Sequence, residues 1–186
     1  MLVIMPVDIQ QGLDEWPYWG GDRSTPDFER NVATLLAAAR AAGQSLIHVK
    51  HNSTNPDSLL RPGQAGNEFK PEARPLDGEP VIGKSVNSAF IGTGLETRLK
   101  EMGANRLIIF GLTTQHCVST TVRMAGNLGF ETFLVSDATA AFPIRDANGH
   151  VMDAETVHRV HLASIDGEFA TVISTQEAVS LIRSAG

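Results

Sequence analysis

Short apolar segments alternate with helix-like segments along the whole chain, and this alternation restricts the fold more than any other feature. Six segments of five to seven residues are rich in Val, Ile, Leu and Phe: residues 2–8, 45–51, 80–84, 106–111, 131–137 and 169–174. Strands with so little polar alternation are typical of a sheet that helices cover on both faces. The pattern therefore predicts an α/β fold with a doubly wound, six-stranded parallel sheet.

Signals for helix starts and ends lie between these segments. Thr25 and Pro26 predict the start of a helix that ends at Gly43. Residues 93–96 and 174–177 match the capping box, in which a Ser or Thr and a later Glu bond each other's backbone N–H groups.

Two further helices are predicted after Thr114 and after Asp153. The side chains expected to face the core are Val118, Val122 and Ala125 in the first, and Val157 and Val160 in the second. No repeat or linker divides the chain, so we expect one domain over residues 1–186.

Composition excludes several classes of protein. The net charge of −6 over 186 residues, with no basic run, argues against a partner that is a nucleic acid or an anionic membrane. No apolar run reaches the length of a membrane span, and the first residues lack the basic segment of a signal peptide. A single cysteine permits no internal disulfide, so we expect a cytoplasmic protein.

Long connections follow the first, second and fifth predicted strands. They cover residues 9–24, 52–79 and 138–152. The carboxyl ends of parallel strands share one edge of the sheet, and ligands of open α/β sheets bind there. The length of the second connection is typical of a functional loop or a subunit contact.

Three reactive residues follow strands at this edge. Asp8 and Lys84 end the first and third strands, and Cys117 begins the helix after the fourth. Each alone has an ordinary interpretation: a turn-capping carboxylate, a solvated ammonium and a small packed thiol. Together they favour nucleophilic catalysis, with the helix start and Lys84 expected to lower the pKa of the thiol and Asp8 to carry its proton.

Several segments carry a family resemblance. "PVDIQQGL", "GKSVNSAFIGTGLETRL", "GLTTQHCVSTTVRMAGNLGFETFLVSDATAAF" and "GEFATVIST" resemble the isochorismatase-like cysteine hydrolases over essentially the whole chain. The resemblance implies a three-layer α/β/α fold with strand order 3-2-1-4-5-6, in a homodimer or larger homo-oligomer. It also implies a catalytic Asp–Lys–Cys triad at Asp8, Lys84 and Cys117, a cis peptide at Leu112–Thr113, and an oxyanion hole from the N–H groups of Thr113 and Cys117.

Two branches of this family fit less well. Nicotinamidases hold a divalent metal with histidines that include one on the loop after the second strand, and residues 52–79 contain no His. True isochorismatases cleave a vinyl ether and lack the thiol. We therefore expect a hydrolase without metal or cofactor, similar to streptothricin hydrolase and biuret hydrolase-like enzymes. It would cleave a C–N bond in a small amide or carbamoyl compound through a thioester. The alternatives are nicotinamidase or isochorismatase activity, or a non-catalytic flavodoxin-like binding module.

Further residues are candidates for binding the substrate. Gln10 would hold Asp8 or the substrate, or be solvated. An apolar wall could come from Trp16, Trp19 and Phe90, which could equally pack a loop or a subunit contact. Asn87 and Gln115 offer hydrogen bonds to an amide, or cap turns.

The histidines nearest the thiol are expected to have no catalytic role. His116 should point away from the site because of its helical position beside Cys117. His158 and His161 share the i,i+3 spacing of metal ligands but have no evident third partner, so a solvated or interface face is favoured.

Overall fold

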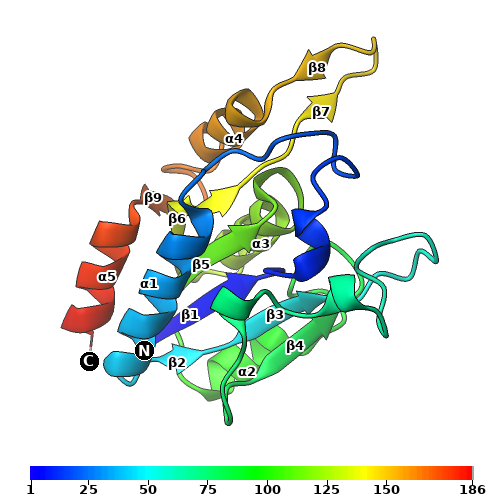
Figure 1. The fold of residues 1–186 in the computed structure, drawn as a ribbon. Coiled ribbons are helices and arrows are strands. Elements are labelled where there is room, and N and C mark those ends of the chain that lie inside the picture. The colour runs from blue at the N-terminus through cyan, green and yellow to red at the C-terminus, as the bar shows by residue number, and fades with distance from the viewer. Residues whose placement is uncertain (186) are drawn as a thin grey trace.

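The protein, as a computed structural model, is described over residues 1–185 and is built around one parallel sheet (Figure 1). The sheet has the order β4-β3-β1-β5-β6-β9, with every pairing parallel. Its strands are β1 (Leu2–Val7), β2 (Ser45–Leu46), β3 (His48–His51), β4 (Val81–Lys84), β5 (Arg106–Leu112), β6 (Glu131–Ala140) and β9 (Thr171–Ile173). The predicted order 3-2-1-4-5-6 is confirmed, and the second predicted strand is divided into β2 and β3.

Helices cover both faces of the sheet. α1 (Phe28–Ala41) and α5 (Thr175–Ser184) lie side by side on one face, and α2 (Leu95–Glu101) and α3 (Ser119–Asn127) cover the other (Figure 1). α4 (Ala154–Ala163) contacts β6 and the turn before α3. The prediction of three layers is therefore confirmed.

β1 shows why its sequence is apolar without alternation. All six of its residues are buried, and their side chains alternate between two core clusters. Leu2 and Ile4 pack under α1 and α5, whereas Val3, Met5 and Val7 pack under α2 and α3. A strand that is buried on both faces has no position for a polar side chain.

The helix-start predictions succeed at one capping box and fail at the other. Ser174 and Glu177 form the predicted box at the start of α5. At the start of α2 the N-cap is instead Gly94 in a left-handed conformation, and Thr93 lies one residue too early to close a box. Glu96 pairs with Lys100 at 2.5 Å instead.

Two other local predictions were wrong. α1 begins at Phe28, because Thr25 has a positive φ of 60° and its hydroxyl donates to the Thr139 carbonyl at 2.9 Å. In α4, Val157 is buried as predicted but Val160 is 60% exposed. The inner face of this helix carries His158 instead, so the expectation of a solvated His158 was also wrong.

The connections at the carboxyl edge contain short ordered turns that were not predicted. Three 3-10 turns occupy Gln11–Asp14, Ala65–Asn67 and Pro71–Ala73, and an antiparallel hairpin of β7 (Ile144–Arg145) and β8 (Val151–Met152) extends away from the sheet (Figure 1). The first two connections pack closely. A Cβ on Gly12 would lie 2.9 Å from the Gly66 carbonyl oxygen, so only glycine allows this approach.

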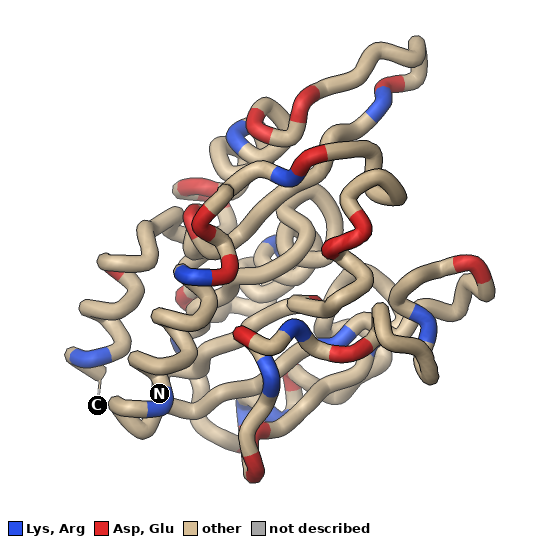
Figure 2. The backbone as a smooth tube through the Cα atoms, in the orientation of Figure 1, with Lys and Arg blue, Asp and Glu red and all other residues tan. Residues whose placement is uncertain are grey.

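The charged residues form no single basic region along the described chain, and Figure 2 shows Lys and Arg interspersed with Asp and Glu. None of the helices within residues 1–185 combines the length and the apolar character needed to cross a membrane.

Candidate active site

The cysteine lies in an unusual turn between β5 and α3. Thr113 is extended after β5, and Thr114–Val118 form one π-helical turn that leads directly into α3. The Thr113 carbonyl accepts hydrogen bonds from the N–H groups of His116 and Val118 at 3.1 and 3.2 Å. The Leu112–Thr113 peptide bond is cis, at the position that the family resemblance implies. Cys117 is thus placed inside the turn, where isolated turns of this type are often functional.

Asp8 and Lys84 meet at the same edge. Asp8 follows β1 with a positive φ of 51°, and its N–H donates to the Val49 carbonyl at 2.9 Å. Lys84 ends β4, and its Nζ donates to Asp8 Oδ2 at 2.6 Å. Each residue is only 2% exposed. The structure therefore brings two of the predicted side chains into direct contact from strands that are not neighbours in the sheet.

The second carboxylate oxygen of Asp8 is free. Oδ1 is buried and has no hydrogen-bond partner within the described chain. Ligand atoms of Asp8, His51 and Cys117 all lie within 4.8 Å of one another. Burial of an unpaired acceptor costs free energy, so an unpaired carboxylate oxygen on Asp8, close to a thiol that can donate, indicates a functional role.

The thiol is more weakly acidic than expected. Burial, and to a lesser extent the Asp8 carboxylate, raise the pKa of Cys117 to about 12, and the Lys84 ammonium only partly opposes these two effects. The prediction of a lowered pKa was wrong, because desolvation of the sulfur and a close carboxylate outweigh the helix start and the lysine. At rest the sulfur therefore carries its proton.

His51 is a site residue that the sequence analysis missed. Its Nδ1 lies 3.0 Å from Lys84 Nζ. Burial lowers the pKa of its imidazole, and Lys84 lowers it further against the opposing effect of Asp8. His51 pairs with Lys84 in the register of β3 and β4. Its position as the last residue of a predicted strand, like Asp8 and Lys84, was the available signal.

Lys84 lies beside a possible set of metal ligands around the thiol. Asp8, His51 and Cys117 could each offer a metal ligand. Lys84 bonds Asp8 Oδ2 and His51 Nδ1, which leaves Asp8 Oδ1, His51 Nε2 and Cys117 Sγ as the remaining ligand atoms. Within the described residues, no further His, Cys, Asp or Glu is grouped with these three.

A cavity of about 340 Å³ opens onto the thiol. Its walls are Asp8, Leu13, Trp19, His51, Ser58, Leu60, Asn87, Leu112, Thr113, His116 and Cys117. None of these eleven residues is Lys or Arg. Leu13 comes from the connection at residues 9–24, and Ser58 and Leu60 come from the connection at residues 52–79. The two leucines add apolar surface to the cavity that contains the reactive groups.

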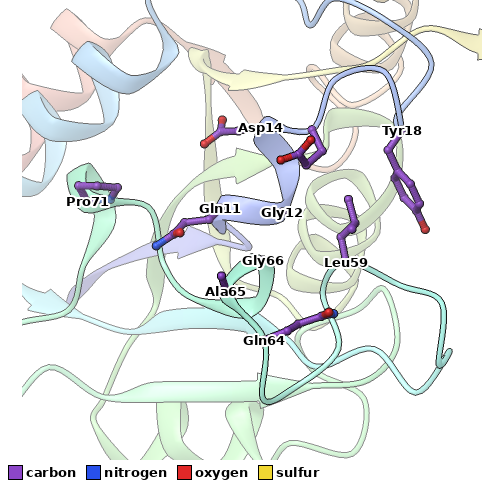
Figure 3. A pocket seen from close by; sticks show the side chains of 10 residues that line it. Gln11, Gly12, Asp14, Tyr18, Leu59, Gln64, Ala65, Gly66 and Pro71 are labelled. Atoms are coloured by element: carbon purple, nitrogen blue, oxygen red, sulfur yellow. The ribbon is translucent and has the colours of Figure 1, made fainter.

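Figure 3 shows a second, larger hollow of about 700 Å³. Figure 3 shows it between the turn at Gln11–Asp14 and the loop around Leu59 and Gln64. It contains none of the reactive residues. Leu13 and Leu60, next in sequence to its wall residues, line the thiol cavity instead.

A family model described as "Isochorismatase domain" matches residues 1–177. The chain belongs to the isochorismatase family. It is 44% identical over 174 residues to the uncharacterized isochorismatase family protein YrdC of Bacillus subtilis, covering 94% of this chain and 92% of that protein. It is 29% identical over 144 residues to a streptothricin hydrolase of Streptomyces noursei, covering 76% of this chain and 50% of that protein.

Solved structures of the isochorismatase family are also similar. A family protein from Chromobacterium violaceum superposes with a TM-score of 0.93 and 44% identity, covering 98% of this chain and 93% of that chain. A cysteine hydrolase from Pseudomonas syringae superposes with a TM-score of 0.89 and 27% identity, covering all of this chain and 93% of that chain.

Within this isochorismatase-family site, only some of the expected binding residues reach the cavity. Trp19 and Asn87 line it. The Trp19 indole N–H donates to the Gly12 carbonyl at 2.7 Å, and its ring stacks on Phe142. Trp16 and Phe90 do not reach it: Trp16 is 38% exposed beside Arg23, and Phe90 is buried in the core.

The two candidate glutamines are also absent from the cavity walls. Gln10 is fully buried and holds the backbone of His51, donating to its carbonyl at 3.0 Å and accepting from its N–H at 2.8 Å. Gln115 approaches the Phe142 carbonyl at 3.5 Å. The expectation that Gln10 holds Asp8 or the substrate is therefore replaced by a role in positioning His51.

The expectations for the other histidines need correction. His116 lines the cavity rather than pointing away, since a π turn rotates side chains differently from an α-helix. His158 is buried, and its Nδ1 lies 2.8 Å from Thr114 Oγ1, so it anchors the start of the π turn. The i,i+3 spacing of His158 and His161 brings no metal cluster together in the described chain, and His161 contacts the Val157 carbonyl instead.

Proposed function

We propose that this isochorismatase-family protein is a cysteine hydrolase that cleaves a C–N bond in a small, uncharged amide or carbamoyl compound. The observation that carries the proposal is the buried Asp8 carboxylate, with Oδ1 unpaired and one oxygen within 4.8 Å of the protonated thiol of Cys117, at the wall of a cavity. A protonated nucleophile next to an unoccupied base is the arrangement that general-base activation needs.

In the first half of the reaction, Cys117 attacks the carbonyl carbon while its proton passes to Asp8 Oδ1. The oxyanion of the tetrahedral intermediate accepts hydrogen bonds from the backbone N–H groups of Thr113 and Cys117. Asp8 then gives the proton to the departing nitrogen, the C–N bond breaks, and an amine or ammonia leaves. A thioester on Cys117 remains.

In the second half, water replaces the amine. Asp8 takes one proton from the water as its oxygen attacks the thioester carbonyl. The C–S bond breaks, the sulfur recovers the proton from Asp8, and the carboxylic or carbamic acid leaves. Lys84 stays bonded to Asp8 Oδ2 throughout, which keeps Oδ1 aimed at the sulfur and balances the carboxylate charge.

The cavity walls support an uncharged substrate. Its volume of about 340 Å³ suits a small molecule, and its walls hold no Lys or Arg to pair with a substrate carboxylate. Isochorismate carries two carboxylates, so isochorismatase activity is disfavoured. Nicotinamidase activity that depends on a metal is disfavoured because residues 52–79 contain no histidine.

The test is a panel of small amides, ureas and lactams, assayed for ammonia or amine release and by intact mass spectrometry after acid quenching. We expect at least one substrate to release amine and to leave an acyl mass on Cys117. Cys117→Ala should lose both signals, by about 10⁴-fold or more in turnover, with an unchanged circular dichroism spectrum. Turnover that persists in this variant would refute the proposal.

The panel also separates the alternatives. Hydrolysis of nicotinamide only after a divalent metal is added would support a nicotinamidase instead. Binding of panel members with neither amine release nor an adduct would support the non-catalytic module.

A further inference from the structure

His51 is held more firmly than a surface residue at a strand end would be. It is the last residue of β3, and fully buried Gln10 bonds both its N–H and its carbonyl oxygen. The Asn67 side chain also donates to that carbonyl at 2.9 Å. Because the backbone is fixed on both sides, the imidazole is fixed against the cavity that it lines.

The contact with Lys84 decides which nitrogen of His51 carries the proton. An ammonium group has only donors, so Nδ1, at 3.0 Å from Lys84 Nζ, must accept. An imidazolium has no acceptor and could not make this bond. The ring is therefore neutral with its proton on Nε2, and the lowered pKa of His51 agrees with this state.

The proton on Nε2 has no protein partner. Within residues 1–185 no acceptor bonds Nε2, and this atom is not among the buried polar atoms that lack a partner. It is therefore accessible at the cavity wall. Asp8, Lys84, Cys117 and His116 are the other ionisable groups at this place, and none of them bonds Nε2.

We propose that His51 selects the substrate, donating a hydrogen bond from Nε2 to a second acceptor on the amide. The catalytic importance of this hydrogen bond rests on the proposed function, whereas the hydrogen bond itself is tested by measurements of binding. One of the two ring nitrogens of His51 lies within 4.8 Å of Cys117 Sγ, so an acceptor bound by Nε2 would lie within a few bonds of the carbonyl under attack. The preferred class is a small neutral amide with another carbonyl, or a ring nitrogen, near its amide carbon.

The first test reads the tautomer directly. Among the signals of the six histidines in a long-range ¹H–¹⁵N spectrum at pH 7, the ring that disappears in His51→Gln should be neutral and protonated on Nε2. A ring protonated on Nδ1, or a charged ring at pH 7, would overturn the inference.

The second test uses two probes of the same size. Acetoacetamide has a second carbonyl, and isovaleramide replaces it with a CH–CH₃ group. Their dissociation constants are measured by NMR titration in Cys117→Ala protein, which removes turnover from the comparison. We expect acetoacetamide to bind about 3–10-fold more tightly, the range of one neutral hydrogen bond.

Matched substitutions at position 51 complete the test. His51→Leu in the same background should reduce the preference to less than about twofold. His51→Gln should retain it, because an amide can both accept from Lys84 and donate into the cavity. A preference that survives in His51→Leu, equal binding of both probes, or no binding of acetoacetamide would overturn the inference. Failure of the amide panel would refute the proposed function but leave this binding result standing.

Discussion

The protein buries two lysines against carboxylates, and the two clusters differ in how completely they are paired. Lys70 is 3% exposed and bonds Asp14 and Glu29, and Arg23 bonds both oxygens of Glu29 at 2.9 Å. Lys84 is 2% exposed and bonds only one oxygen of its carboxylate, Asp8. We call the first cluster closed because both oxygens of Glu29 are paired, although Arg23 Nε has no partner among the described residues, whereas the second cluster leaves one oxygen of Asp8 unpaired near a thiol.

For this reason the pKa of Glu29 in the first cluster is lowered, whereas the pKa of Cys117 beside the second cluster is raised. Burial alone would raise the pKa of Glu29, but the bonds from Arg23 and Lys70 outweigh it and lower the pKa to about 2. At Cys117, burial and the Asp8 carboxylate both raise the pKa of the thiol, and the opposing effect of the Lys84 ammonium is smaller. Pairing of both carboxylate oxygens stabilises the negative charge of Glu29, whereas the unpaired oxygen of Asp8 leaves an acceptor for a proton near Cys117.

The largest expected effect comes from removing the open acceptor. Asp8→Asn should lower turnover by about 10²–10⁴-fold, because the proton carrier is lost. The same change removes a negative charge beside the sulfur, so the pKa of Cys117 should fall and iodoacetamide should alkylate it faster than in the wild type. Turnover near the wild-type rate would show that Asp8 is only structural.

Exchanging the two lysines for methionine compares the clusters directly. Lys84→Met should lower turnover by about 10²-fold or more, since the Asp8 carboxylate loses the one hydrogen bond that it makes within residues 1–185. Lys70→Met should leave turnover within about twofold and lower the free energy of unfolding by about 2–4 kcal/mol. Turnover is measured at a temperature where thermal melts show the same folded fraction for both variants. A loss of turnover is thereby distinguished from a loss of folded protein. Equal loss of turnover in both variants would contradict the distinction.

Glu29→Gln should weaken the closed cluster by about 2 kcal/mol at pH 7. Because the folded pKa of Glu29 is depressed, its contribution is complete above the ordinary value of 4.5 and is lost as the pH falls toward about 2. Urea melts from pH 7 to pH 3 should therefore show the wild type and the variant converging in acid. A constant difference would mean that the ionised carboxylate is not the stabilising form.

The smallest expected effect on stability comes from a control substitution that lies outside both clusters. Ser174→Ala removes the hydroxyl of the capping box at α5 and should cost about 1 kcal/mol of stability, with turnover unchanged. A matching loss of turnover would show that ordinary destabilisation reaches the site, and the activity losses above would then need correction for it.

Much of the fold followed from local patterns. The parallel sheet and the shared edge of Asp8 and Lys84 were predictable, because apolar runs and parallel connections constrain a sheet without detailed geometry, whereas the strand order came from the family resemblance. Helix starts were less predictable, as Gly94 shows, since one left-handed residue moves the cap. The cavity walls were poorly predicted: Phe90 packs in the core, and Leu60 reaches the site from a loop whose path has no periodic pattern.

The order of residues alone determined that a carboxylate, an ammonium and a thiol would follow strands on one edge of an α/β sheet. Only the tertiary structure decided that the thiol of Cys117 stays protonated, that Asp8 keeps one oxygen free, and that His51 joins the site. The physical reason is that hydrophobic periodicity is a property of neighbouring residues. Proton affinity, in contrast, depends on burial and on charges that the fold brings within a few ångströms from distant parts of the chain.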